Sequence, residues 1–210
     1  MGEVLQEVRV LHLGLTEYEV ALGRMRDFTV RRDADTADEL WVLEHPPVYT
    51  LGLAADRSHG PRADNGIPVV QVERGGEVTY HGPGQAVLYT LVDLARRGLK
   101  VKRFVRLLEQ SVIDLLDGRG ERKAGAPGIY VNGAKVAALG IRVTRGCSFH
   151  GLALNVDMDL APFEAIDPCG YPGLRVTQTR DLGIAGDAAT LGRRLAGILA
   201  THLAAEFEHA

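Results

Sequence analysis

The chain has 210 residues, of which 46% are hydrophobic and 24% are charged, and this ordinary globular composition excludes the disordered and fibrous classes. Its net charge is −3 and no basic run is longer than Arg31-Arg32 or Arg193-Arg194, which argues against a nucleic-acid partner, because such a partner requires basic surface. No segment has the length of a membrane span, and the first residues lack the features of a signal peptide, so we expect a cytoplasmic protein without a membrane partner. Two cysteines cannot build a disulfide framework, which agrees with that compartment. From the length we expect one domain over residues 1–210.

The N-terminal half is predicted to combine one helix with several short strands. Residues 6–13 are predicted to form a strand, because apolar and polar side chains alternate from Val8 on. A capping-box pattern, Thr16-Glu17-Tyr18-Glu19, predicts the start of a helix whose apolar face extends to Phe28. The remaining elements of this half are predicted to be strands over 40–44, 48–51 and 69–73 and loops over 31–38 and 54–68.

The next elements combine a strand with two longer helices. An apolar run over 86–92 predicts a strand, and apolar residues at helical spacing predict a helix over 101–117 that ends at Gly118. Near the C-terminus, Asp187 precedes a periodic apolar segment and is placed to cap a final helix.

Between these helices, residues 129–156 are typical of an antiparallel meander. Asn132-Gly133 is a strong signal for a two-residue hairpin turn, and Arg145-Gly146 indicates a second turn. Strands outnumber helices and hairpins are present, so the sequence predicts an α+β fold in which helices flank a mixed β-sheet.

The first segment with chemical content is rich in glycine. It has the sequence Arg74-Gly75-Gly76-Glu77-Val78-Thr79-Tyr80-His81-Gly82-Pro83-Gly84-Gln85. Glycines allow a ligand to approach main-chain amides closely, and the interspersed Arg, Tyr and His supply polar and aromatic contacts. The alternative is a tight connection between strands. No Gly-Lys-Ser/Thr follows and the spacing is not that of a dinucleotide fingerprint, so a nucleotide loop is not predicted.

The second segment places a lysine in an apolar run. Lys135 is followed almost only by small and apolar residues, and on a strand it shares its face with Ala137 and Leu139. A lysine in this position commonly extends its amine to solvent. The functional alternative is a partly buried amine that holds positive charge near a thiol, or that loses its proton and acts as a base.

The third segment contains a candidate nucleophile. Cys169 lies between Pro168 and Gly170, which indicates a turn rather than a packed element. Free cysteines are usually buried and inert, whereas a turn leaves the sulfur accessible. A reactive thiolate requires a cationic neighbour, and the candidates are Lys135 and His81.

The remaining cysteine and histidines receive structural interpretations. Cys147 is interpreted as a small core or edge residue, and a Cys147–Cys169 disulfide is disfavoured by the expected compartment. His45 and His150 are expected to form hydrogen bonds with the local backbone. No CxxC or HxxxH spacing occurs, so no metal site is predicted.

Four segments taken together resemble one known family. They are Arg74 to Gln85, Lys135-Val136-Ala137-Ala138-Leu139-Gly140, Cys147 to Val156, and Pro168-Cys169-Gly170. In this order they are similar to the lipoyl(octanoyl) transferases, and the resemblance extends from about residue 5 to about residue 200. It implies the fold of biotin and lipoate protein ligases.

The resemblance also implies a reaction and its partners. Members of this family transfer an octanoyl group from octanoyl-acyl carrier protein to a lysine of lipoyl domains, which occur in the E2 subunits of 2-oxoacid dehydrogenase complexes and in the glycine cleavage H protein. The transfer is expected to pass through a Cys169 thioester, with Lys135 as the activating partner, and to need no cofactor and no ATP. We expect a monomer.

Residue roles follow from the matched motifs. The resemblance implies a catalytic pair of Cys169 and Lys135. It implies substrate-binding residues in three segments: Arg74, Gly75, Gly76, Glu77, Val78, Thr79, Tyr80 and His81; Ala138, Leu139 and Gly140; and Gly151, Leu152 and Ala153. The chain departs from the family pattern at Ala138 and at Gln178, where relatives commonly have Ser, and both positions are expected near the site.

Several alternatives share some of these features. An octanoyl or lipoyl amidotransferase also uses a cysteine, whereas an ATP-dependent lipoate-protein ligase of the same fold does not need Cys169. A non-catalytic module that binds lipoyl domains would keep the surface and lose the Cys–Lys pair. A Cys–His hydrolase that uses His81 would leave Lys135 unexplained.

Overall fold

A seven-stranded mixed sheet forms the centre of the protein in the computed structural model, which describes residues 7–62 and 64–208. The strands are β1 Arg9–Leu15, β2 Glu39–Glu44, β3 Val48–Leu51, β4 Val69–Gln71, β5 Val78–His81, β6 Gln85–Leu91, β7 Glu121–Arg122, β8 Gly128–Val131, β9 Ala134–Thr144 and β10 Cys147–Asn155. The helices are α1 Tyr18–Arg31, α2 Val101–Leu115 and α3 Ala188–Glu208, with short 3-10 turns η1 Arg57–His59, η2 Ala161–Ala165, η3 Pro168–Gly170 and η4 Arg180–Leu182.

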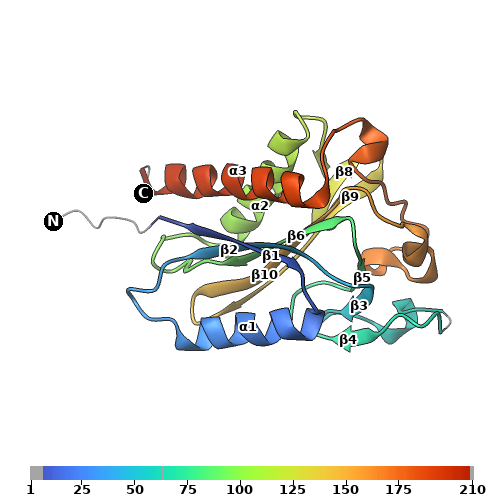
Figure 1. Cartoon of the computed structure of the whole chain (residues 1–210), viewed down its shortest axis with the longest axis horizontal. Helices are drawn as coiled ribbons and strands as arrows, with labels where there is room; N and C mark the ends of the chain where they lie inside the picture. Colours follow the sequence, from blue (N-terminus) through green and yellow to red (C-terminus); the bar gives the residue numbers. More distant parts are fainter. Residues whose placement is uncertain (1–6, 63, 209–210) are drawn as a thin grey trace.

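The main sheet has the strand order β1-β2-β6-β10-β9-β8-β7. β1 pairs with β2 in parallel, and the other neighbours are antiparallel, so the sheet is mixed as predicted. A second sheet of three strands has the order β4-β3-β5. Helices α2 and α3 cover one face of the main sheet and α1 covers the other (Figure 1). The prediction of an α+β fold is confirmed.

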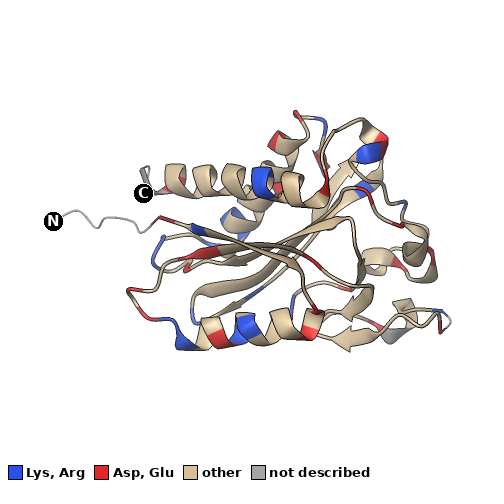
Figure 2. Cartoon of the chain, in the orientation of Figure 1, with Lys and Arg blue, Asp and Glu red and all other residues tan. Residues whose placement is uncertain are grey.

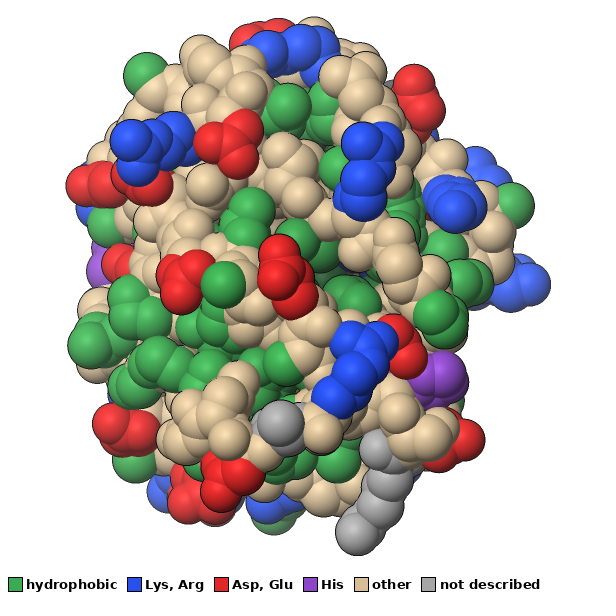
Figure 3. All heavy atoms as spheres, turned by 90° about the vertical axis from the view of Figure 1, so that its right-hand side faces the viewer, with side chains coloured by type: hydrophobic (Ala, Val, Ile, Leu, Met, Phe, Trp, Pro, Cys, Tyr) green, Lys and Arg blue, Asp and Glu red, His purple; other side chains and the backbone are tan. Residues whose placement is uncertain are grey.

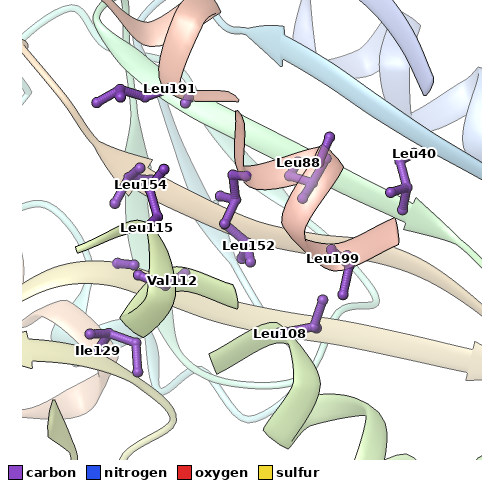
Figure 4. Packing of buried hydrophobic residues seen from close by; sticks show 14 of the residues in the cluster. Leu40, Leu88, Leu108, Val112, Leu115, Ile129, Leu152, Leu154, Leu191 and Leu199 are labelled. Atoms are coloured by element: carbon purple, nitrogen blue, oxygen red, sulfur yellow. The ribbon is translucent and has the colours of Figure 1, made fainter. Parts of the chain in front are cut away.

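The core consists of layers on the two faces of the sheet. Leu152 and Leu154 of β10 point toward α2 and α3, where Leu108 and Leu199 meet them (Figure 4). Ala153, between the two leucines, faces α1 instead. This alternation is the two-residue period of a strand buried on both faces, and it explains why β10 is apolar almost throughout.

Tight turns set the register of the meander. Asn132 and Gly133 have φ values of 50° and 75°, and Arg145 and Gly146 have 52° and 80°. Two positive φ values in succession are the signature of the hairpin turn whose twist matches that of the flanking strands. Both predicted turns are therefore confirmed, and they join β8 to β9 and β9 to β10.

Two helix starts were predicted, with different outcomes. Asp187 caps α3 as expected, because its Oδ1 accepts a hydrogen bond from the Thr190 N–H at 2.7 Å. The prediction of a capping box that begins at Thr16 is wrong. Its hydroxyl donates to the Leu13 carbonyl at 3.1 Å, and Glu17 takes the N-cap position without a side-chain bond. Gln6, the first residue of the predicted N-terminal strand, lies outside the described residues.

Charged residues occur on strands, helices and loops throughout the fold (Figure 2), and Asp38 is notable among them for its burial. This fully buried carboxylate forms ion pairs with Arg32, Arg96 and Arg97, and it accepts the Asp93 N–H at 2.8 Å. These contacts join the start of β2 to the segment after β6. Across residues 7–62 and 64–208, no helix combines the length and apolar character needed to cross a membrane.

Candidate active site

Cys169 and Lys135 come into direct contact although 34 residues separate them in the chain. The Lys135 Nζ donates a hydrogen bond to the Cys169 Sγ at 2.9 Å and a second one to the Pro127 carbonyl at 2.9 Å. The lysine is 3% exposed, so its amine does not extend to solvent. Both cysteines are free, and Cys169 is the more accessible one. The structure thus selects Lys135 over His81 as the cationic neighbour of the thiol.

Backbone pairing brings the cysteine segment to the start of β9. The Lys135 N–H donates to the Arg175 carbonyl at 2.8 Å, and its own carbonyl accepts the Thr177 N–H at 2.9 Å. This short parallel bridge returns the chain along β9 after the turn at Pro172-Gly173. Because both the N–H and the carbonyl of Lys135 are hydrogen-bonded, its backbone is fixed and only its side chain can move relative to the sulfur.

The turn that carries Cys169 has a strained backbone, and contacts from residues 59 and 62 hold it in place. Cys169 has φ 58° and ψ 25°, a left-handed conformation that costs free energy for a residue other than glycine. The preceding Asp167 is held by an ion pair with Arg62, by a hydrogen bond with His59 Nδ1 at 3.2 Å, and by the bond from its own N–H to the His59 carbonyl at 3.0 Å. These contacts hold the turn in a geometry that directs the sulfur at Lys135.

A cavity of about 430 Å³ opens beside the cysteine. It is lined mainly by apolar atoms, and Cys169 and Tyr171 belong to its wall. The end of the molecule that carries residues 160–175 exposes hydrophobic side chains between charges of both signs (Figure 3). Such a cavity accommodates an apolar ligand bound to the sulfur.

Most residues with a predicted substrate role line this cavity. Those that do are Arg74, Gly75, Gly76, Glu77, Val78, Thr79, His81, Ala138, Leu139, Gly140, Gly151, Leu152 and Ala153. Tyr80 is not among the lining residues, since its ring packs against Tyr49 and Phe163 beneath the small sheet. The three segments converge because Gly140 and Gly151 are direct partners across β9 and β10, and the Gly75 N–H donates to the Ile141 carbonyl at 3.0 Å.

Arg74 contributes a buried positive charge to the cavity wall. Its guanidinium donates to the Thr50 carbonyl and hydroxyl at 2.8 Å each, whereas its Nε has no partner in the described part of the chain. Burial lowers the pKa of Arg74, and the nearby Tyr18 and Cys169 act in the opposite direction. A buried donor without a partner is suited to an oxygen atom of a ligand.

A cluster of aromatic and imidazole side chains lies at another part of the cavity. Tyr18, His81 and Tyr89 line the wall, and His45 lies behind them in ring contact with all three. Burial lowers the pKa of His45 to about 4 and that of His81 to about 3, and it raises the pKa of Tyr18 to about 12. All these groups are therefore neutral near pH 7.

His150 belongs to the same cluster. It is 1% exposed, lines the cavity and packs edge-on against the Tyr89 ring. Neither ring nitrogen has a hydrogen-bond partner among the described residues, so the expectation that His150 bonds the local backbone is wrong. The same expectation is confirmed for His45, whose Nδ1 lies 2.6 Å from the Thr16 carbonyl oxygen.

The two departures from the family pattern have different surroundings. Ala138 lines the cavity, whereas Gln178 does not. The Gln178 side-chain oxygen accepts the Met158 N–H at 2.8 Å and so supports the loop after β10. Sequence reasoning also missed the Pro127 carbonyl beside Lys135 and the tyrosine at position 18. The only signal for Tyr18 was its place on the apolar face of a helix.

Comparison with known proteins identifies relatives of this chain. Residues 17–189 match the family described as the lipoyl protein ligase A/B catalytic domain. An octanoyltransferase from Aromatoleum aromaticum is 60% identical over 89% of this chain and 81% of its own length.

Solved structures agree on the fold. A lipoate-protein ligase A bound with ATP superposes with a TM-score of 0.72 at 17% identity, covering 97% of this chain and 86% of its own. A biotin protein ligase from Aquifex aeolicus gives 0.54 at 10% identity, covering 98% of this chain and 72% of its own. At these identities the likeness concerns the fold alone, and it confirms the expected ligase-like architecture.

Proposed function

This chain belongs to the lipoyl protein ligase A/B catalytic domain family and is an octanoyltransferase of protein lipoylation, and we propose that it transfers the octanoyl group through a thioester on Cys169. The observation that carries this mechanism is the 2.9 Å contact between the Lys135 amine and the Cys169 sulfur at the wall of an apolar cavity.

The first half-reaction is a thioester exchange. The lysine ammonium stabilises the Cys169 thiolate, which attacks the carbonyl carbon of the donor thioester. The carbon–sulfur bond to the donor breaks, and the departing thiolate takes a proton from Lys135. One thioester replaces another, so the step is nearly balanced in energy and needs no ATP.

The second half-reaction forms an amide. The neutral Lys135 left by the first step accepts a proton from the attacking lysine of the acceptor domain, and Cys169 leaves as a thiolate. The Lys135 Nζ also donates to the Pro127 carbonyl oxygen at 2.9 Å and lies 5.2 Å from the centroid of the Tyr130 ring. These two neighbours keep the amine in place through both steps.

Acceptors of the lipoyl-domain type follow from the family. We assign octanoyl-acyl carrier protein as the donor, and the lipoyl domains of 2-oxoacid dehydrogenase E2 subunits and of the glycine cleavage H protein as the acceptors. We further propose a monomeric, cytoplasmic enzyme built as one domain. The free state of both Cys147 and Cys169 supports a reducing compartment.

A direct test is acylation of the purified chain by octanoyl-acyl carrier protein without ATP or acceptor. We expect a mass gain of one octanoyl group on Cys169 and its loss when a lipoyl domain is added. Cys169→Ala abolishes the adduct, and Lys135→Ala lowers the rate of transfer by about 10²–10⁴-fold because base and charge are lost together.

The matched control is Cys147→Ala, which removes the other free cysteine on β10 and leaves transfer intact. Near-normal transfer by Cys169→Ala would refute the acyl-enzyme. Transfer that requires ATP and free octanoate would instead identify a ligase.

A further inference from the structure

The register of β9 gives the offset between the reactive pair and His150 along the strand direction. The Lys135 amine lies beside Gly128, because a Cβ at Gly128 would lie 3.1 Å from Nζ, and Gly128 is paired with Ala138. His150 is paired with Ile141, three residues farther along the same strand. At about 3.3 Å per residue, this offset is roughly 10 Å.

An eight-carbon acyl chain has a similar length. Its seven carbon–carbon bonds of about 1.5 Å in zigzag form span roughly 9 Å. The cavity wall contains both Cys169 and His150, so an acyl group bound to the sulfur and extended along β9 reaches the level of His150 on that strand. The far end of an otherwise apolar chain therefore meets a polar cluster.

The hydrogen bonds behind this cluster have a fixed direction. The Thr16 carbonyl can only accept, so His45 Nδ1 carries its proton and His45 Nε2 accepts the Tyr89 hydroxyl at 2.6 Å. The Tyr89 proton is then used in this bond, so the Tyr89 oxygen can only accept from a group in the cavity.

His81 is oriented in the same sense. Its Nδ1 lies 2.7 Å from the side-chain oxygen of Gln85, whose amide nitrogen donates to the Tyr80 carbonyl and to Asn155. The oxygen can only accept, so Nδ1 is protonated and His81 Nε2 is an acceptor. His150 adds one donor and one acceptor, both without partners in the described chain.

We propose, on the basis of the octanoyl transfer described above, that the His150 end of the cavity is a polar subsite which accepts medium-chain acyl groups with a hydroxyl at their far end. The hydroxyl donates its one proton to an acceptor of the cluster, such as His81 Nε2, and accepts a hydrogen bond from the His150 N–H. It takes no part in the reaction, in which the same thioester and amide bonds form and break as for octanoyl. A site that binds a hydroxyl leaves its own polar groups unpaired when the hydroxyl is absent, which is the basis of strong discrimination.

The test compares 8-hydroxyoctanoyl with nonanoyl, which has a methyl group in place of the hydroxyl. Acyl-enzyme formation from the two carrier thioesters is measured with octanoyl as the reference substrate, and binding of the two free acids is measured by calorimetry. We expect the wild-type chain to prefer the hydroxylated group by at least about tenfold in both measurements.

Two variants isolate the polarity of position 150. His150→Asn and His150→Leu have nearly the same shape, and Asn tolerates the φ of 61° found here. The asparagine variant retains most of the preference, whereas the leucine variant reverses it in favour of nonanoyl. His202→Leu, on α3 and outside the cavity, leaves the preference unchanged.

Equal use of the two acyl groups by the wild-type chain overturns the proposal, as does a preference that persists in His150→Leu. Calorimetry does not depend on catalysis, so it detects the subsite independently of turnover. Failure of the octanoyl reference reaction would refute the proposed function, whereas normal octanoyl transfer without discrimination would refute the subsite alone.

Discussion

Gly128 determines how closely the Lys135 amine approaches the sulfur. An added Cβ would lie 2.7 Å from Lys135 Cε and 2.6 Å from the Ala137 carbonyl oxygen, at a φ of 134°. We predict that Gly128→Ala displaces the amine and lowers the rate of acyl-enzyme formation by about 10²-fold, since a displacement of about 1 Å in a catalytic group has an effect of this size. Single-turnover acylation measures it.

Gly118→Ala is the matched control. Gly118 also has positive φ, 79°, and nothing lies within 4 Å of its added Cβ. Both variants place a side chain at positive φ, and only the added Cβ of Gly128→Ala reaches the lysine. Equal acylation rates in the two variants would contradict the role given to Gly128.

At the scale of single residues, the sequence predicts which side chains are reactive better than it predicts which groups contact them. Cys169 between proline and glycine and Lys135 in an apolar run are local signals, and both residues lie at the cavity or beside it. The Pro127 carbonyl is invisible in sequence because any residue offers one. His150 was misjudged because whether a buried histidine has a partner depends on strands that are distant in the chain.

Among the elements, the two predicted helix caps had different outcomes: the cap at Asp187 is present, and the capping box at Thr16 is not. The bond from the Thr190 N–H to Asp187 fixes the first turn of α3, and hydrogen bonds from the side chain and then from the N–H of Thr190 lower the pKa of Asp187. We predict that Asp187→Ala lowers the free energy of unfolding, and by more than Thr16→Ala does, because it removes this cap. Thr16→Ala, which removes no cap, should change it by less than about 0.5 kcal/mol. Urea unfolding of both variants measures the difference.

The same contrast applies to the strands. The hairpin turns on both sides of β9 could be predicted because two residues determine them. The strand β5 was not predicted, although it forms four pairs with β3, because its glycine-rich neighbours obscure the pattern. The parallel bridge from Lys135 to Val176 was equally hidden, since it joins segments about 40 residues apart.

In the whole molecule, three buried histidines couple stability to pH. Desolvation lowers the pKa of His45 to about 4 and those of His81 and His150 to about 3, from 6.5. The unfolded chain binds protons near pH 6.5 whereas the folded chain does not, so stability is complete above that pH and falls as the pH decreases toward 3. At pH 5 the three residues together account for a loss of about 6 kcal/mol.

We therefore predict steep acid destabilisation. A loss of about 6 kcal/mol is a large part of the 5–15 kcal/mol typical of a domain, so the urea midpoint should fall sharply between pH 7 and pH 5. Because His150→Asn removes one of the three protons taken up on unfolding, it should reduce the slope of stability against pH by about a third. A urea midpoint that stays constant over this range would mean that these imidazoles acquire protons without unfolding. In that case water reaches the inner end of the cavity, and the cluster is hydrated rather than dry.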